Sequence, residues 1–99
     1  MKVLLVCAAG MSTSLLVANM RKFAGKEDVI EAKSASELPK SVGNYEVVLV
    51  GPQIRHEFGK IKALCQKYKV KTGLIDMASY GKMDGRAAME LAKELINQK

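Results

Sequence analysis

The apolar residues of this chain form two patterns, namely uninterrupted runs of strand length and stripes that repeat with helical spacing. The longest runs cover residues 2–6 and 45–50, and shorter ones cover 28–32 and 72–75. An uninterrupted apolar run is typical of a parallel strand that is buried on both faces, whereas the more polar run at 28–32 suits a sheet edge. We therefore predict four strands, of which the first and third are the most deeply buried.

Apolar residues at spacings of three and four predict three helices. The first spans about 13–24 and ends near Gly25, the second begins at Ile54, and the third is capped by Asp84. The buried faces are predicted to hold Leu16, Met20 and Phe23 or Ala24 in the first helix, Ile54, Phe58, Ile61, Leu64, Cys65 and Tyr68 in the second, and Ala87, Ala88, Leu91, Ala92, Leu95 and Ile96 in the third.

Turn-forming residues occupy the remaining segments. Ser34 or Ser36 is predicted to cap a brief helical turn, which Pro39 and the Gly43-Asn44 pair end before the third strand begins. Residues 76–83 are predicted to form a loop. Strands and helices thus alternate over a chain of 99 residues, which predicts one α/β domain, residues 1–99.

The predicted fold is a flavodoxin-like, four-stranded parallel sheet in the strand order 2-1-3-4, with helices on both faces. This order places the two most apolar strands in the centre. Open sheets of this kind bind ligands at the carboxyl ends of the strands between which the chain order reverses. Cys7 ends one central strand and Gly51-Pro52-Gln53 follows the other, so we expect the functional site there.

The segment after Cys7 has the composition of an anion-binding turn. The small residues Ala8, Ala9 and Gly10 come first, and Met11 and the helix-starting residues Ser12, Thr13 and Ser14 follow. One of Ser12 and Thr13 is expected to cap the helix, and the hydroxyls of all three can donate to phosphate oxygens. Unpaired N–H groups and the positive end of the helix dipole favour negative charge at such a turn. These residues predict a nucleophilic cysteine that accepts a phosphoryl group.

The formal net charge of +6 comes from 16 Lys and Arg against 10 Asp and Glu, and suits an acidic protein, an anionic substrate or nucleic acid. A basic adaptor or nucleic-acid-binding module is therefore one hypothesis. The densest lysine cluster lacks interleaved aromatic residues and predicts a solvated helix face, with no nucleic-acid partner; it comprises Lys60, Lys62, Lys67, Lys69 and Lys71. Because no apolar run approaches the roughly 18 residues of a membrane helix, and the first is short for a signal peptide, we expect a cytoplasmic protein.

The two cysteines lie in chemically different settings, and His56 is the single histidine. The sequence therefore predicts no disulfide, no metal site and no cofactor. Cys65 lies on a helical stripe and is expected to be a core thiol. His56 is expected to be exposed and without a catalytic role.

A second hypothesis is a cysteine-dependent phosphatase of low molecular weight. Such enzymes also place a cysteine after the first strand, with an arginine six residues further on, where this chain has Thr13. Without that arginine, the clamp that stabilises the transferring phosphoryl group is missing. The loop residues able to protonate a leaving group are Asp76 and Asp84. The missing arginine favours a phosphocysteine that persists until a partner takes its phosphoryl group.

Three segments carry a resemblance to a known family. They are residues 6–16, Val-Cys-Ala-Ala-Gly-Met-Ser-Thr-Ser-Leu-Leu; residues 47–54, Val-Val-Leu-Val-Gly-Pro-Gln-Ile; and residues 80–85, Tyr-Gly-Lys-Met-Asp-Gly. Together they resemble the IIB component of the bacterial phosphoenolpyruvate-dependent sugar phosphotransferase system, in its lactose/cellobiose/chitobiose family.

The resemblance implies a four-stranded parallel sheet and a phosphocarrier function. Cys7 would accept a phosphoryl group from a histidine of the IIA component, with the residues from Ala8 to Ser14 cradling it. Cys7 would then pass the group to a sugar bound by the membrane component IIC, which implies a peripheral association with that transporter. Cellobiose, chitobiose or a related β-glucoside all remain open as the sugar. We expect a monomer, because no strand has the pattern of an unprotected apolar edge.

Four further residues are expected near the crevice. Pro52 and Gln53 either shape its mouth or only form the turn from strand to helix. Tyr80 and Lys82 follow the fourth strand, at the same end of the sheet. Lys82 either supplies positive charge to the phosphate or belongs to a loop that only leads to the last helix.

Overall fold

The computed structural model describes the backbone of residues 1–7 and 10–97, and the side chains of these residues except 10–13. The described residues contain a four-stranded parallel sheet with the order β2-β1-β3-β4, which confirms the predicted topology. The strands are β1 (Lys2–Cys7), β2 (Val29–Ser34), β3 (Val47–Val50) and β4 (Lys71–Leu74).

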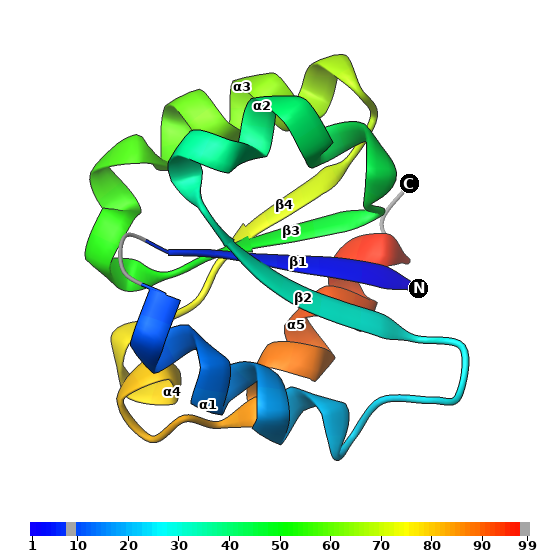
Figure 1. The fold of residues 1–99 in the computed structure, drawn as a ribbon, viewed down its shortest axis with the longest axis vertical. Helices are drawn as coiled ribbons and strands as arrows, with labels where there is room; N and C mark the ends of the chain where they lie inside the picture. Colours follow the sequence, from blue (N-terminus) through cyan, green and yellow to red (C-terminus); the bar gives the residue numbers. More distant parts are fainter. Residues whose placement is uncertain (8–9, 98–99) are drawn as a thin grey trace.

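Helices cover both faces of this sheet, as Figure 1 shows. On one face lie α2 (Leu38–Ser41) and α3 (Phe58–Lys67), and on the other lie α1 (Gly10–Arg21), α4 (Met77–Gly81) and α5 (Gly85–Ile96). Three short 3-10 helices complete the described elements, namely η1 (Ala35–Glu37), η2 (Val42–Asn44) and η3 (Pro52–Glu57). None of the described helices is long and apolar enough to cross a membrane.

The core has two layers, one on each face of the sheet. Val3 and Leu5 belong to the layer under α1 and α5, whereas Leu4 and Val6 belong to the layer under α2 and α3. Alternate residues of a strand point to opposite faces. Because helices cover both faces, all four side chains are fully buried. The uninterrupted apolar run of β1 therefore serves both layers at once.

The register of the central strands places the expected site. Val6 of β1 pairs with Val50 of β3, and the Gly51 N–H donates to the Val6 carbonyl at 2.9 Å. The chain leaves both strands at this level, toward α1 after β1 and toward η3 after β3. The carboxyl ends of β1 and β3 therefore lie side by side, as predicted.

The first helix differs from the prediction at both ends. It begins at Gly10, so Ser12 and Thr13 lie within its first turn, and the prediction that one of them precedes and caps it is wrong. It ends at Arg21, and the next three residues form backbone hydrogen bonds to the carbonyl three positions earlier, as in a 3-10 helix, which tightens the chain. This tightening turns Phe23 outward, to 49% exposure, and leaves Ala24 against the core. Gly25 is not a left-handed helix cap, because no described glycine has a positive φ.

Two other predicted helical segments are also corrected. The chain does not enter a helix directly at Ile54, because this residue has a non-helical backbone inside η3, and α3 begins only at Phe58. Since α3 ends at Lys67, Tyr68 falls outside its buried face and is 54% exposed. The predicted loop 76–83 contains α4, which Asp76 caps by accepting from the Ser79 N–H at 3.0 Å.

The predicted cap of the last helix is confirmed, whereas the predicted cap of the turn after β2 is not. Asp84 caps α5 as predicted, by accepting from the Ala87 N–H at 3.0 Å. Ser34 precedes η1 in the predicted position, but its hydroxyl lies 3.0 Å from that of Ser36 and makes no capping bond. The turn is therefore held by its backbone bonds, while the predicted N-cap side chain has another partner.

Candidate functional site

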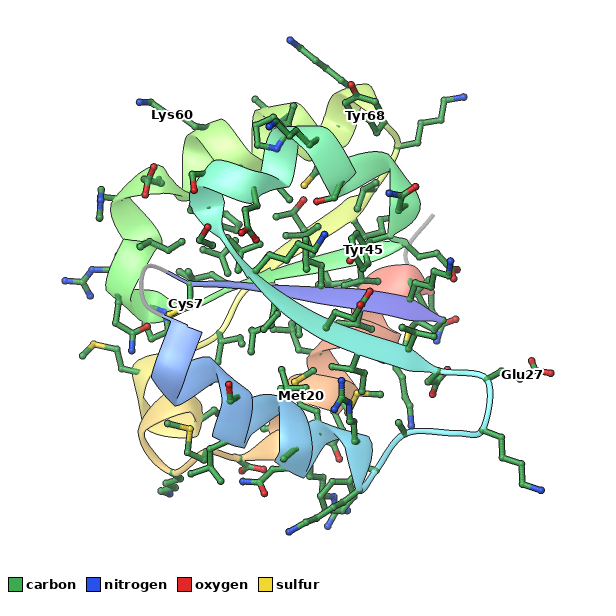
Figure 2. The ribbon with its side chains drawn as sticks, in the orientation of Figure 1. Cys7, Met20, Glu27, Tyr45, Lys60 and Tyr68 are labelled. Atoms are coloured by element: carbon green, nitrogen blue, oxygen red, sulfur yellow. The ribbon has the colours of Figure 1, made fainter. Side chains whose placement is uncertain are left out.

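Cys7 is the last residue of β1 and is almost completely buried, with 3% of its surface exposed. Figure 2 shows it at one end of the sheet, opposite the end where the chain starts. The buried strand positions its backbone, and the layer of core residues under α1 and α5 includes its side chain. The sulfur thus sits at the carboxyl end of a rigid central strand, where the sequence places the functional site.

Two polar side chains from distant parts of the chain reach the Cys7 sulfur. Its Sγ lies 3.7 Å from Oε1 of Gln53, to which the thiol donates. Oη of Tyr80 lies 3.5 Å from the same sulfur, and either atom can be the donor. Gln53 comes from η3 and Tyr80 from α4, so three segments meet at one sulfur atom. The sequence singles out both residues but does not predict this contact.

Helix α1 begins at Gly10, three residues after Cys7, and has 12 residues. Its first N–H groups have no partner within the helix, and its positive dipole end lies on the side of the cysteine. No acidic residue occupies its first turn, so nothing in that turn opposes a bound anion. Of the predicted cradle, Ala8 and Ala9 lie outside the described residues, as do the side chains of Gly10, Met11, Ser12 and Thr13. Ser14 is exposed within α1.

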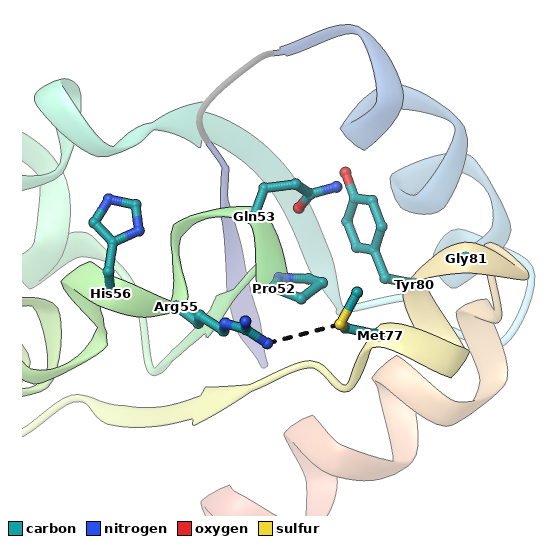
Figure 3. A pocket seen from close by; sticks show the side chains of 7 residues that line it. All are labelled: Pro52, Gln53, Arg55, His56, Met77, Tyr80 and Gly81. Carbon is teal, nitrogen blue, oxygen red and sulfur yellow. Dashed lines mark hydrogen bonds between the residues drawn. The ribbon is translucent and has the colours of Figure 1, made fainter.

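A hollow of about 610 Å³ adjoins this site. Figure 3 shows Gln53 and Tyr80 turned toward each other at one side of it, and Arg55 donating to the Met77 sulfur, at 3.7 Å, at another. The described residues that line it are Pro52, Gln53, Arg55, His56, Met77, Tyr80 and Gly81. Pro52 occupies the first position of η3, as predicted for a turn from strand to helix.

Two other residues that the sequence analysis considered, His56 and Lys82, have exposed side chains, whereas Gln53 and Tyr80 contact the Cys7 sulfur. His56 lines the hollow, and 72% of its side chain is exposed, as predicted; its lack of a catalytic role stays a prediction. Lys82 is exposed at the end of α4 and is not among the described residues that line the hollow. Sequence reasoning did not select Arg55 and Met77, because neither belongs to a motif.

The two aspartates considered as proton donors both serve as helix caps. Hydrogen bonds from the hydroxyl and N–H of Ser79 hold the pKa of Asp76 below its usual value, so this carboxyl is ionised at neutral pH. Asp84 accepts from the Ala87 N–H at the start of α5. A general acid must carry a proton at working pH, so the state of Asp76 counts against a phosphatase.

Cys65 has the structural role that its sequence position predicts. It is fully buried in the core layer under α2 and α3, the opposite layer from Cys7, and burial raises the pKa of its thiol. A thiol held in its neutral form in an apolar core is a poor nucleophile. Of the two cysteines, Cys7 is therefore the candidate nucleophile.

Several known proteins are similar to this chain in sequence. The family model described as "PTS system, Lactose/Cellobiose specific IIB subunit" matches residues 2–91. The oligo-beta-mannoside-specific EIIB component of Bacillus subtilis is 37% identical, over 98% of both chains. The galactose-specific and cellobiose-specific EIIB components of two Lactococcus lactis strains are also 37% identical, each over 94% of both chains. The lactose-specific EIICB component of Staphylococcus epidermidis is 31% identical over 96% of this chain, but only 17% of that longer protein.

Solved structures agree as well. The cellobiose-specific phosphotransferase IIB component of Borrelia burgdorferi is 34% identical, with a TM-score of 0.80 over 98% of this chain and 92% of that one. The lactose-specific IIB domain of Streptococcus pneumoniae shares the fold at 16% identity, with a TM-score of 0.85 over 99% of this chain and 98% of that one. The family model and the relatives above 30% identity show that the chain belongs to the lactose/cellobiose-specific IIB subunits of the sugar phosphotransferase system.

Proposed function

We propose that the protein is a phosphocarrier, in which Cys7 accepts a phosphoryl group from a histidine of a IIA component and passes it to a sugar bound by a membrane IIC component. The observation that carries the proposal is the Cys7 sulfur, held at the end of β1 before the N-terminus of α1. Such a helix terminus offers N–H donors and a positive dipole end to a phosphoryl group.

Two displacement steps make up the cycle. In the first, Cys7 Sγ attacks the phosphorus of phosphohistidine, so that an S–P bond forms, the N–P bond breaks and the thiol proton ends on the histidine nitrogen. In the second, a sugar hydroxyl oxygen attacks the phosphorus, so that an O–P bond forms, the S–P bond breaks and the hydroxyl proton returns the cysteine to its thiol form. The nearly buried position of Cys7 limits competing attack by water.

A long-lived phosphocysteine is the central requirement of this function. Thr13 stands where the phosphatases carry their arginine, and Asp76 is held ionised as a helix cap. Thr13 in place of that arginine removes the clamp that would speed hydrolysis, and an ionised Asp76 is a poor proton donor for it. This combination favours a carrier over the alternative, a cysteine phosphatase.

The proposed partners follow from the family and the charge. The name of the Staphylococcus epidermidis relative, EIICB, joins a C and a B component in one protein, and this chain matches a small part of it. We accordingly place Cys7 at the cytoplasmic side of a IIC transporter during the second step. The net charge of +6 favours the approach of a phosphorylated, and hence anionic, IIA site.

The proposed acceptor is cellobiose, chitobiose or a related β-glucoside. Relatives named for oligo-beta-mannosides, galactose and cellobiose match this chain at the same 37% identity, so identity to these relatives does not single out one sugar. A transport assay with the cognate IIC, offering each of these sugars in turn, identifies the acceptor.

The deciding experiment is the intact mass of the wild type, Cys7→Ser and Cys65→Ala after incubation with phosphoenolpyruvate, the general phosphotransferase proteins and the IIA component. We expect one phosphoryl group on the wild type and on Cys65→Ala, located at Cys7, and none on Cys7→Ser. The group should leave when sugar and IIC-bearing membranes are added. Phosphorylation of Cys7→Ser at another residue, or steady release of inorganic phosphate by the wild type, would contradict the proposal.

A further inference from the structure

Gln53 contacts the reacting sulfur with an amide that has two chemically different ends. Its Oε1 only accepts hydrogen bonds, whereas its Nε2 only donates them. In the structure Oε1 faces Cys7 Sγ at 3.7 Å, the arrangement that a protonated thiol requires. Tyr80, the other polar side chain on this sulfur among the described residues, can donate or accept and so suits either state.

Phosphorylation of Cys7 changes which hydrogen-bonding groups suit the neighbours of its sulfur, from acceptors to donors. The phosphoryl group carries roughly 1.5 to 2 negative charges, by analogy with phosphoserine, and its oxygens accept hydrogen bonds. A carbonyl oxygen facing these oxygens would repel them, whereas an amide N–H₂ group would donate to them. The terminal torsion of glutamine has broad, roughly two-fold preferences, so its amide turns at little cost.

The surroundings of Gln53 allow this turn. The residue is exposed, and Figure 3 shows its amide at the edge of the hollow, beside the Tyr80 ring. Gly51 leaves the space that the amide occupies, since a Cβ there would lie 3.0 Å from Gln53 Oε1 and 3.5 Å from Cys7 Sγ. The backbone of Gly51, with φ −69° and ψ 148°, is one that alanine adopts freely. Its lack of a side chain is therefore required for space and not for conformation.

We propose that Gln53 is a switchable contact of the Cys7 sulfur, whose carbonyl accepts from the thiol before transfer and whose N–H₂ group, after a turn of the amide, donates to the phosphoryl oxygens. This inference rests on the proposed phosphocarrier function. The transfer itself is unchanged: an S–P bond replaces the N–P bond, and the thiol proton passes to the IIA histidine. Gln53 supplies only hydrogen bonds, in the orientation that each state requires.

Two substitutions at Gln53 separate its donor role from its volume. Gln53→Met keeps the length without hydrogen bonds, and Gln53→Glu keeps an acceptor but places a negative charge against the phosphoryl group. The rate of phosphoryl transfer is measured over a range of phosphorylated IIA concentrations. Gln53→Met should lower kcat about tenfold, which corresponds to the loss of one hydrogen bond to a charged group, with little change in KM. Gln53→Glu should lower kcat further, by about a hundredfold, because it adds charge repulsion. Gln66→Met, the same change at an exposed glutamine of α3, is the matched control and should match the wild type.

A double substitution tests the part played by Gly51. Gly51→Ala should push the Gln53 amide away from the sulfur and lower kcat, while the chain still folds. The double variant Gly51→Ala with Gln53→Met should lose no more kcat than the more impaired of the two single variants, because both changes remove the same contact. Additive losses would show that Gly51 acts independently of Gln53 and would overturn this part of the proposal.

The outcomes distinguish this inference from the proposed function. Equal rates for the wild type and Gln53→Met, or for Gln53→Met and Gln53→Glu, would overturn the donor role while leaving the carrier function intact. A wild type that acquires no phosphoryl group at Cys7 would contradict the carrier function. In that case alkylation of Cys7 by iodoacetamide still reports the contact: at a fixed pH, Gln53→Glu should slow the alkylation relative to the wild type, because its carboxylate faces the sulfur, and an unchanged rate would refute the contact.

Discussion

At the scale of single residues, Cys7 and Tyr45 occupy opposite ends of the same sheet, as Figure 2 shows, and have opposite electrostatic surroundings. Cys7 faces a helix N-terminus, which favours negative charge. Tyr45 is 7% exposed, and its hydroxyl donates to a Glu31 carboxylate oxygen at 2.8 Å. Burial, and then the carboxylate, raise the pKa of Tyr45 to about 12. One end of the sheet thus suits an anion, and the other holds a phenol neutral.

The raised pKa of Tyr45 predicts a pH dependence of stability. The folded pKa of about 12 lies above the ordinary value of 10.0, so this group's contribution to folding is complete below pH 10 and is lost as the pH rises toward 12. In an ultraviolet titration of tyrosinate, the wild type should show a late step that Tyr45→Phe lacks. The free energy of unfolding of Tyr45→Phe should also fall less steeply in this window. Titration curves that differ only in amplitude would contradict the assignment.

At the scale of elements, the contact between α1 and α5 sets the geometry of the site. Gly85 begins α5 against the backbone of α1, and the Asn19 side-chain amide of α1 donates to the Met83 carbonyl, just before α5, at 2.8 Å. The segment that carries Tyr80 is thereby anchored to the helix whose N-terminus faces Cys7. The Tyr80 contact with the sulfur therefore depends on how closely these helices approach.

A matched pair of glycine substitutions tests this close approach. At Gly85 a Cβ would lie 2.5 Å from Asn19 O and from Met20 N, which are backbone atoms that no side-chain rotation can move aside. Gly85→Ala should therefore destabilise the protein by about 3 kcal/mol, the upper end for overpacking. At Gly59, exposed in α3, a Cβ meets nothing within 4 Å, so Gly59→Ala should stabilise by about 0.5 kcal/mol. Urea unfolding measures both values, and equal effects at the two positions would refute the packing argument.

At the scale of the whole molecule, the positive charge bears on how a phosphorylated partner approaches. Arg55 lines the hollow beside the site, whereas Lys69 lies just before β4, at the other end of the sheet. Both side chains are exposed, so salt screens both, but only Arg55 lies near the proposed point of transfer. The distribution of charge, and not its total, should then decide the rate of encounter.

Salt and two charge substitutions test this expectation. The second-order rate of phosphoryl transfer from phosphorylated IIA should fall as NaCl is raised, because salt screens electrostatic steering. Arg55→Gln should lower the rate at low salt and weaken its salt dependence, whereas Lys69→Gln, with the same loss of charge, should change both less. A rate that does not respond to salt would exclude steering by these charges.

Features that depend on neighbouring positions in the chain were predictable. The apolar runs of β1 and β3, the stripe of α5 and its Asp84 cap follow from periodicity and capping, and the alternation of strands with helices led to the 2-1-3-4 sheet order. Boundaries were less predictable: α4 was expected as a loop, and the start of α1 was expected near residue 13 instead of at Gly10. Helix ends depend on how nearby elements pack as well as on local sequence, so they are the least predictable part of a helix.

The sequence by itself determined the fold class, the position of Cys7 at the end of a central strand and the family resemblance. Only the tertiary structure decided which side chains meet at the sulfur, because Gln53 and Tyr80 lie 46 and 73 positions away from Cys7. Periodicity reports which face of an element is buried, but not which distant residues share that face. Contacts over such separations are set by sheet register and helix packing, and these also bring Gly51 close to the Gln53 amide and the Cys7 sulfur.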